Sequence, residues 1–307
     1  MLFRSMKTKK IFSSIGVVTA AALALVACGK SGNNNNATNT VKKFAKETPV
    51  KTAKQGGTIK VALETDTPFT GIFSPELATT SNDASVAGPG DEELFDTDNQ
   101  YKINDKGPAT LKLDRNAKTA TITVKKGVKW SDGEQVNAKD IEYSYEILAN
   151  KKTASQRYNS QFENIPGMKE YHDGKAKTIS GIEMPQGEKG RTVVIHFKEL
   201  KPGMYYSGNG YFWESAAPYH YLKNVPFNKL QSSNQIRQKP LYFGPFKVQK
   251  IVRGQSVTWV PNKYYWRGRP KLNKIVIQVV SPNSASQSIK SHKFDIAAVR
   301  NSQWEIG

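Results

Sequence analysis

The residue with the most specific chemistry in this chain is Cys28, the only cysteine among 307 residues. Its thiol follows an apolar segment, from about Ile11 to Leu23, and then Leu25-Val26-Ala27. The segment is preceded by a basic N-terminus (Arg4, Lys7, Lys9 and Lys10). A basic start, a short apolar segment and small residues before a cleavage point are the features of a secretory signal, predicted here over residues 1–27. Cleavage there makes Cys28 the first residue of the mature chain, where its thiol can carry a lipid.

The residues from Leu25 to Cys28 resemble a bacterial lipobox, in which the cysteine thiol receives a diacylglyceryl group. Two acyl chains on one residue suffice for stable membrane attachment, so we predict lipid attachment at Cys28. An ordinary signal peptide with an incidental cysteine is disfavoured, because the cysteine stands at the cleavage position and nowhere else. A membrane-spanning helix is also disfavoured, since the uncharged run between Ile11 and Gly29 is short for a bilayer.

The other side chains that could do chemistry form no catalytic or metal-binding pattern. The histidines lack metal-ligand spacing (His172, His196, His220 and His292), and His196 is expected to be structural within an apolar strand. The sequence has no Gly-x-Ser-x-Gly motif, no phosphate-binding glycine loop and no cysteine nucleophile. Glu142 and Glu146 share a helix face among lysines, and we interpret them as solvated. We therefore expect no enzyme activity, no metal ion and no cofactor.

Composition limits the partners of the chain. The net charge is +19, and +15 once the four basic residues of the signal are left out. The lysines are scattered rather than gathered on one element, and no nucleic-acid motif is present, so nucleic acid is not an expected partner. The charge instead favours anionic surfaces such as cell-wall polymers or lipid headgroups. With no second cysteine, a hydrophobic core rather than a disulfide must hold the fold.

The elements that must position a site begin after residue 56. Residues 28–56 carry almost no large apolar side chains and are predicted to be a disordered tether. Period-two alternation then predicts strands at Thr58–Leu63, Ala109–Leu113, Ala120–Val124, Thr192–Phe197, Phe246–Ile251, Ser256–Val260 and Ile275–Val280. A helix is predicted over residues 137–150, with Asn137 as its cap and Asp140 at its third position. This mixture indicates an α/β chain.

Two motifs follow from these elements. In residues 127–140, Gly133 allows a turn, Trp130 anchors it and Asn137 opens the helix, so packing alone accounts for the pattern. Residues 244–275 describe a strand, a turn, a second strand, an aromatic loop and a third strand.

Together, and behind the Cys28 segment, the two motifs resemble the solute-binding protein family 5. This family comprises extracytoplasmic receptors of ABC transporters for oligopeptides, dipeptides and nickel. Residues 127–140 follow its pattern G-V-K-W-S-D-G-x-x-x-x-A-x-D, and residues 244–275 follow G-x-Y/F-K … N-x-x-Y-W … P-x-x-x-x-I. The strongest likeness is to the oligopeptide-binding lipoproteins of Gram-positive bacteria. The resemblance implies an α/β fold of the type II periplasmic-binding-protein-like class (cluster C) with an extra domain II, truncated.

The same resemblance implies a domain order. Residues 57–100 are the first part of domain I, 101–190 are domain II, and 191–281 are the second part of domain I. Residues 282–307 begin domain III, because Lys290–Ala297 looks like the family's G-x-x-D-I-A segment. Family members run considerably longer, so we expect a truncated domain III, from a fragment or an interrupted reading frame.

The implied function is that of a lipid-anchored receptor on the extracytoplasmic face of the cell membrane. It captures oligopeptides and delivers them to the permease and ATPase complex of an ABC transporter. Candidate ligand-binding residues are Tyr158, Glu76 and Ala78, which match segments that line the family's cleft. The alternatives are a half-buried packing role for Tyr158 and a surface-loop position for Glu76. The alternative function is a cell-surface adhesion or interaction lipoprotein without transport activity.

Overall fold

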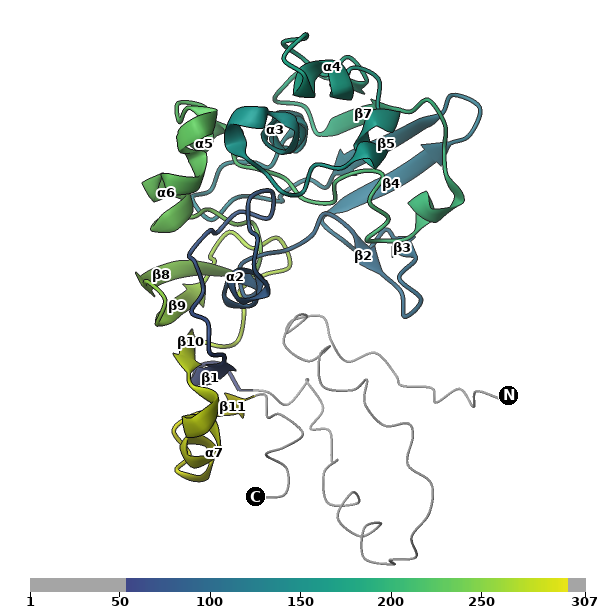
Figure 1. Cartoon of the computed structure of the whole chain (residues 1–307). Helices are drawn as coiled ribbons and strands as arrows, with labels where there is room; N and C mark the ends of the chain where they lie inside the picture. The colour runs from purple at the N-terminus through teal and green to yellow at the C-terminus, as the bar shows by residue number, and fades with distance from the viewer. Residues whose placement is uncertain (1–53, 298–307) are drawn as a thin grey trace, which may run out of the picture.

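The computed structural model describes residues 54–297, so Cys28 and the predicted signal lie outside the described residues. Two β-sheets dominate this part of the chain (Figure 1). One sheet, near the described ends of the chain, lies below the other in Figure 1. Within residues 54–297 no helix has the length and apolar composition that crossing a bilayer requires.

The first sheet has five strands in the order β11-β1-β10-β9-β8. They are β1 (Thr58–Glu64), β8 (Phe246–Val252), β9 (Ser256–Pro261), β10 (Lys274–Val280) and β11 (Ile296–Ala297). β1 pairs in parallel with β10, with Thr58 opposite Lys274, whereas β8, β9 and β10 are antiparallel neighbours. Its core includes the buried side chains of Val61, Val257 and Trp259. The parallel pair requires a long crossover, and the second sheet lies within that crossover.

The second sheet has four antiparallel strands in the order β4-β5-β7-β6. They are β4 (Ala109–Asp114), β5 (Thr119–Val124), β6 (Ile182–Glu183) and β7 (Thr192–His196). Ala120, Ile122 and Val124 are fully buried along β5, as period-two alternation predicts. Strand β7 pairs with β5, so this sheet continues past residue 190, where the sequence predicted the end of domain II. Alternation identifies a strand but not the sheet that it joins.

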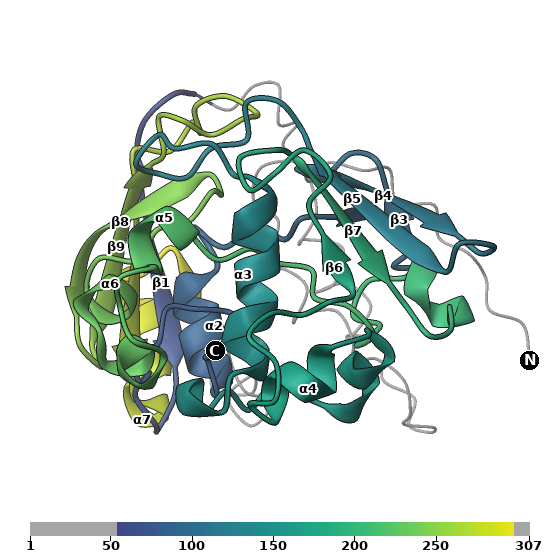
Figure 2. The same cartoon turned by 90° about the horizontal axis from the view of Figure 1, so that it is seen from above.

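Helix α3 (Ala138–Ala149) lies between the two sheets when the molecule is seen from above (Figure 2). Its first turn is closed by a reciprocal capping box. Asn137 Oδ1 accepts from the backbone N–H of Asp140, and the Asp140 carboxylate accepts from the N–H of Asn137. One side of α3, including Ile141, packs into the core of the second sheet. The other side, including Ile147, packs into a third apolar cluster that contains Leu222 and Leu230.

Short elements fill the connections, and the sequence did not predict them; all but α7 have seven residues or fewer, too few to show a hydrophobic period. They are α2 (Ser81–Ala87), β2 (Asp96–Thr97), β3 (Ile103–Asn104), η2 (Lys151–Thr153), η3 (Ser160–Asn164), α4 (Met168–His172), η4 (Pro202–Tyr205), α5 (Tyr219–Leu222), η5 (Phe227–Ser232), α6 (Asn234–Arg237) and α7 (Pro282–Lys290). Here η denotes a 3₁₀ helix.

The strands predicted from alternation and the capped helix are all present, each within a residue or two of its expected bounds. The last residues of the predicted tether are held by the fold. Gln55 Nε2 donates to the carbonyl oxygen of Pro270 at 3.2 Å, and the N–H of Gly56 donates to that of Lys271 at 2.7 Å. The ordered chain therefore begins before residue 57.

Candidate functional site

The loop that follows β1 carries two of the predicted ligand-binding residues, Glu76 and Ala78. Glu76 is buried, with 1% of its surface exposed. Its carboxylate accepts hydrogen bonds from Ser74 Oγ at 2.7 Å and from Trp213 Nε1 at 3.2 Å. Burial raises the pKa of Glu76, and these hydrogen bonds oppose the shift. The interpretation of Glu76 as a surface-loop carboxylate is therefore wrong, because its side chain belongs to the packed interior.

Residues 154–158 dock against this loop through its backbone carbonyl groups. Ser155 Oγ donates to the carbonyl oxygen of Glu76 at 2.6 Å, and Arg157 Nε donates to that of Ala78 at 3.1 Å. The structure thus brings Glu76 and Ala78 together with the residues just before Tyr158. Sequence reasoning did not single out Ser155 and Arg157, since a hydroxyl or guanidinium group gives no sign of which distant carbonyl it reaches.

Tyr158 makes its contacts on η3 and α4. Its ring stacks on that of His172, with centroids 3.9 Å apart and planes inclined by 9°. Its hydroxyl donates to Glu163 Oε1 at 3.4 Å, and the ring lies 6.4 Å from that of Phe162. The side chain is half-buried. These are the contacts of a packing tyrosine, and they lie apart from those that hold Glu76 and Ala78.

A small cavity borders Glu76 between its loop, helices α5 and α6 and residues 240–243. Its volume is about 20 Å³, the size of a single water molecule, so it is too small for a peptide side chain. Its lining includes Glu76, Asp91, Trp130 and Tyr242. The buried hydroxyl of Tyr242 has no hydrogen-bond partner among the described residues. Burial, and to a smaller extent the charges of Glu76 and Glu93, together raise the pKa of Asp91 to about 7.

The motif at residues 127–140 is held by one buried carboxylate. Trp130 Nε1 donates to Asp140 Oδ2 at 2.9 Å, and the N–H of Tyr219 donates to Asp140 Oδ1 at 2.9 Å. Burial raises the pKa of Asp140 to about 6, against the hydrogen bonds from Trp130, Asn137 and Tyr219. Gly133 has a φ of 106°, which favours glycine. The prediction that packing accounts for residues 127–140 is confirmed. The structure adds the hydrogen bond between Trp130 and Asp140, which the sequence did not reveal.

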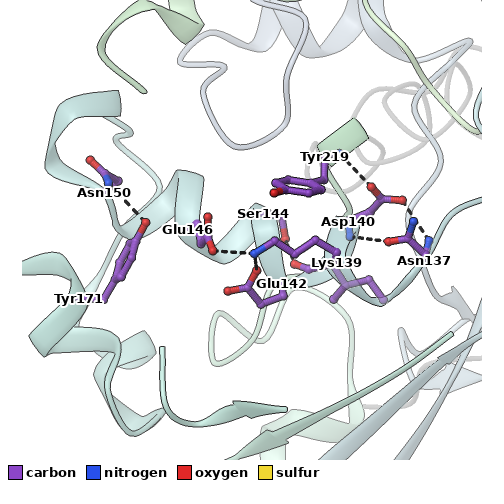
Figure 3. Close-up of polar contacts among 10 residues, drawn as sticks. Asn137, Lys139, Asp140, Glu142, Ser144, Glu146, Asn150, Tyr171 and Tyr219 are labelled. Atoms are coloured by element: carbon purple, nitrogen blue, oxygen red, sulfur yellow. Dashed lines mark hydrogen bonds and ion pairs between the residues drawn. The ribbon is translucent and has the colours of Figure 1, made fainter. Parts of the chain in front are cut away.

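Lys139, Glu142 and Glu146 form a buried charged cluster on α3, although the two glutamates were expected to be solvated. Lys139 Nζ lies 2.6 Å from Glu142 Oε2 and 2.8 Å from Glu146 Oε1, and 5.0 Å from the centroid of the Tyr219 ring (Figure 3). The interpretation of Glu142 and Glu146 as solvated is wrong, because their side chains are only 6% and 14% exposed. Burial raises the pKa of Glu142, the neighbouring Glu146 raises it further, and Lys139 opposes the shift. The helical spacing placed both carboxylates on one face, but it did not show that other elements cover that face.

Among the described residues, no group of three or more His, Cys, Asp or Glu side chains is placed to hold a metal ion. Three of the histidines lie near different groups. His220 Nε2 lies 2.8 Å from Asp132 Oδ2, and His196 Nε2 lies 3.2 Å from Glu183 Oε1. His172 Nδ1 lies 2.7 Å from a backbone carbonyl oxygen of α3.

Solved structures with this arrangement define the class of fold. Lactococcal OppA, complexed with an endogenous peptide in the closed conformation, superposes with a TM-score of 0.79 at 45% sequence identity. The match covers 82% of this chain and 47% of that one. AppA from Bacillus subtilis, in complex with a nonapeptide, shares the fold with a TM-score of 0.63 at 22% identity. The chain has the mixed α/β, type II periplasmic-binding-protein fold that its motifs predicted, over about half of each neighbour.

The family follows from the sequence match. The model of the bacterial extracellular solute-binding proteins, family 5 Middle, matches residues 72–306. The chain belongs to this family of extracellular solute-binding proteins, as its motifs predicted. The oligopeptide-binding protein OppA of Lactococcus lactis subsp. lactis is 44% identical over 296 residues, which cover 94% of this chain and 49% of the relative. OppA of Bacillus subtilis (strain 168) is 25% identical over 285 residues. The chain spans about half the length of the curated relatives that it matches.

Proposed function

We propose that this chain serves as a lipid-anchored receptor that captures oligopeptides outside the cell and delivers them to an ABC transporter. The observation that carries the proposal is the 44% identity to an oligopeptide-binding protein over 94% of this chain. The fold adds support, because the neighbour with a TM-score of 0.79 holds a peptide. The permease and ATPase complex is the partner that this function requires.

A receptor for peptides of varied sequence must bind the main chain, which all peptides share, and leave wet pockets for side chains. We propose that Glu76 and Ala78 act through the shape of their loop, since their carbonyl groups are already bound by Ser155 and Arg157. Tyr158 remains a separate candidate, in the segment that also carries Ser155 and Arg157. Its hydroxyl has one partner, Glu163, at 3.4 Å, a distance long enough for a ligand to compete for it.

Titration of the purified protein with a mixed set of four- to eight-residue peptides tests the receptor function. We expect weak but saturable heat in calorimetry, because the chain spans about half the length of its oligopeptide-binding relatives, and no signal from free amino acids at the same concentration. Tyr158→Phe should weaken peptide binding by about 2- to 10-fold, corresponding to one net hydrogen bond of about 0.5–1.5 kcal/mol. Saturable binding with an unchanged affinity in Tyr158→Phe overturns the assignment of this residue. Absence of saturable binding to every peptide contradicts the receptor function for this chain.

Membrane attachment through Cys28 is tested separately. In cells that process lipoproteins, Cys28→Ala should move the protein from the membrane fraction to the soluble or secreted fraction, because two acyl chains are lost. Fractionation followed by immunoblotting measures the change, and metabolic labelling with a palmitate analogue should mark only the parent chain. A variant that stays wholly in the membrane fraction contradicts lipid attachment at this residue.

A further inference from the structure

The positive charge of this chain is concentrated in its C-terminal part. Between Glu214 and Asp295 the sequence holds fourteen Lys or Arg residues and no Asp or Glu. These residues form α5, η5, α6, strands β8, β9 and β10, helix α7, and the loops between them. A basic region without acidic residues produces a field that attracts anionic surfaces.

The loop between β9 and β10, residues 262–273, places aromatic rings among these charges. Lys263, Arg267 and Arg269 are exposed, whereas Tyr264 and Trp266 are half-buried. Lys263 Nζ lies 4.7 Å from the centroid of the Tyr264 ring, and the Arg267 guanidinium lies 4.5 Å from that of Trp266. Trp and Tyr are enriched at membrane–water interfaces, where their amphipathic rings lie at the level of the headgroups.

Neighbouring segments extend this basic surface. Lys125 Nζ lies 5.2 Å from the Trp266 ring, and Lys129 Nζ lies 5.9 Å from the Tyr264 ring. The loop is fixed from beneath by Glu92, whose carboxylate accepts from Trp266 Nε1 and from Tyr265 Oη, each at 3.2 Å. Burial raises the pKa of Glu92 to about 7, so this carboxylate offsets the cations only in part at neutral pH.

The chain that precedes the fold arrives beside the same loop. Gln55 and Gly56 are hydrogen-bonded to Pro270 and Lys271, and the N–H of Asn273 donates to the carbonyl oxygen of Gly57 at 3.0 Å. In Figure 2 the purple start of the described chain runs beside the yellow-green loops at the top edge. Residues 29–53, which connect Cys28 to this point, can span at most about 90 Å when fully extended. A lipid on Cys28 therefore tethers the folded body at a point beside this loop.

We propose that loop 262–273, together with Lys125 and Lys129, is a membrane-facing surface that binds anionic phospholipid headgroups. The direction in which the loop faces rests on the proposed lipid attachment at Cys28. Binding of headgroups by the loop does not depend on that attachment. Each Lys or Arg near an anionic bilayer contributes about 1 kcal/mol, and the half-exposed rings fit the headgroup region. Binding here would orient the body of the receptor relative to its permease.

The test uses the full chain with Cys28→Ser, so that no lipid contributes. Vesicles of phosphatidylcholine alone and vesicles enriched in phosphatidylglycerol are compared by co-sedimentation at low and at physiological salt. We expect preference for the phosphatidylglycerol vesicles, weakened by salt because the charges are exposed. Adding Lys263→Gln, Arg267→Gln and Arg269→Gln together should reduce binding roughly 100-fold, the effect of three charges at about 1 kcal/mol each.

A matched control removes three exposed lysines around the second sheet that form no ion pair within the described part of the chain: Lys152→Gln, Lys177→Gln and Lys189→Gln. This control should keep most of the binding, and circular dichroism should show both triple variants folded. If both triple variants lose the same amount of vesicle binding, then net charge rather than this loop causes the binding, and the proposal is overturned. Equal binding to both kinds of vesicle, or binding to isolated cell wall but not to phosphatidylglycerol, overturns it as well. None of these outcomes bears on Cys28→Ala in cells, so lipid attachment is judged separately.

Discussion

Replacing Lys139 by Met should lower the free energy of unfolding by about 3–5 kcal/mol at neutral pH, the usual cost of removing one partner from a buried ion pair. Lys139 contacts two carboxylates, and the side chains of Lys139, Glu142 and Glu146 are only 12%, 6% and 14% exposed. Met has a similar length and keeps an apolar side chain at this position, but it lacks the ammonium group that lies over the Tyr219 ring. The loss therefore comes from two carboxyl groups left without a positive charge. Urea denaturation monitored by tryptophan fluorescence measures it.

This loss should depend on pH in a definite direction. In the folded protein the pKa of Glu142 is already raised by burial and by Glu146, and Lys139 opposes that shift. Without Lys139 the folded state holds the proton still more tightly than the unfolded state does. A raised pKa favours folding at low pH, and this advantage is lost as the pH rises from the ordinary value of about 4.5 through the raised one. The difference between Lys139→Met and the parent should thus be largest in mildly alkaline buffer and smaller near pH 5.

Two further variants locate the effect. Lys152→Met changes an exposed lysine just beyond the end of α3 and should alter stability by no more than about 0.5 kcal/mol. The double variant Lys139→Met with Glu142→Gln should recover part of the loss, because one of the two unpaired carboxyl groups becomes neutral. If Lys139→Met alone stays within about 0.5 kcal/mol of the parent at neutral pH, the cluster is not the buried ion group described above.

Local patterns predicted much of the fold because each pattern needs only neighbouring residues. Alternation predicted the strands, and the spacing of Asn137 and Asp140 predicted the capped start of α3. The pairing of β1 with β10 was beyond such patterns, since it joins Thr58 to Lys274 across the whole second sheet. For the same reason the sequence did not show which sheet β7 joins, since its alternation would serve either one, and the structure pairs it with β5.

The candidate site was predicted less completely, for a related reason. The segments around Glu76 and Tyr158 were singled out by their resemblance to a family, and the structure does bring these segments together. Burial was misjudged at three carboxylates, Glu76, Glu142 and Glu146. A charged side chain is usually exposed, and only the partners supplied by distant residues, such as Trp213 on Glu76, make its burial tolerable.

Asp140 should show a second large effect, in the motif that identified the family. The residue is fully buried, and its carboxylate accepts hydrogen bonds from Trp130 Nε1 and from the N–H groups of Asn137 and Tyr219. Asp140→Ala leaves all three donors unpaired. An orphaned buried donor costs about 1–3 kcal/mol, so we expect a loss of about 4 kcal/mol or more in the free energy of unfolding.

Smaller changes around Asp140 should fall in a fixed order. Asn137→Ala removes one half of the capping box and should cost about 1 kcal/mol. Trp130→Phe removes the indole donor and some volume from the core of the second sheet, and should cost about 2–3 kcal/mol. Asp140→Asn keeps the volume and one acceptor oxygen but turns an amide N–H toward a donor, so it should fall between Trp130→Phe and Asp140→Ala.

The order matters more than any single value, because it separates a hydrogen-bonding hub from a simple helix cap. If Asp140 only capped α3, then Asp140→Ala and Asn137→Ala would cost about the same, near 1 kcal/mol. If Asp140 joins the turn at Trp130, the start of α3 and the start of α5, then Asp140→Ala must exceed Asn137→Ala by several kcal/mol. The coupling can be measured directly with the double variant Trp130→Phe and Asp140→Ala, since its effect should fall well short of the sum of the single effects. Additive effects would show that the two residues stabilise the fold independently, and would contradict the shared role assigned to the motif.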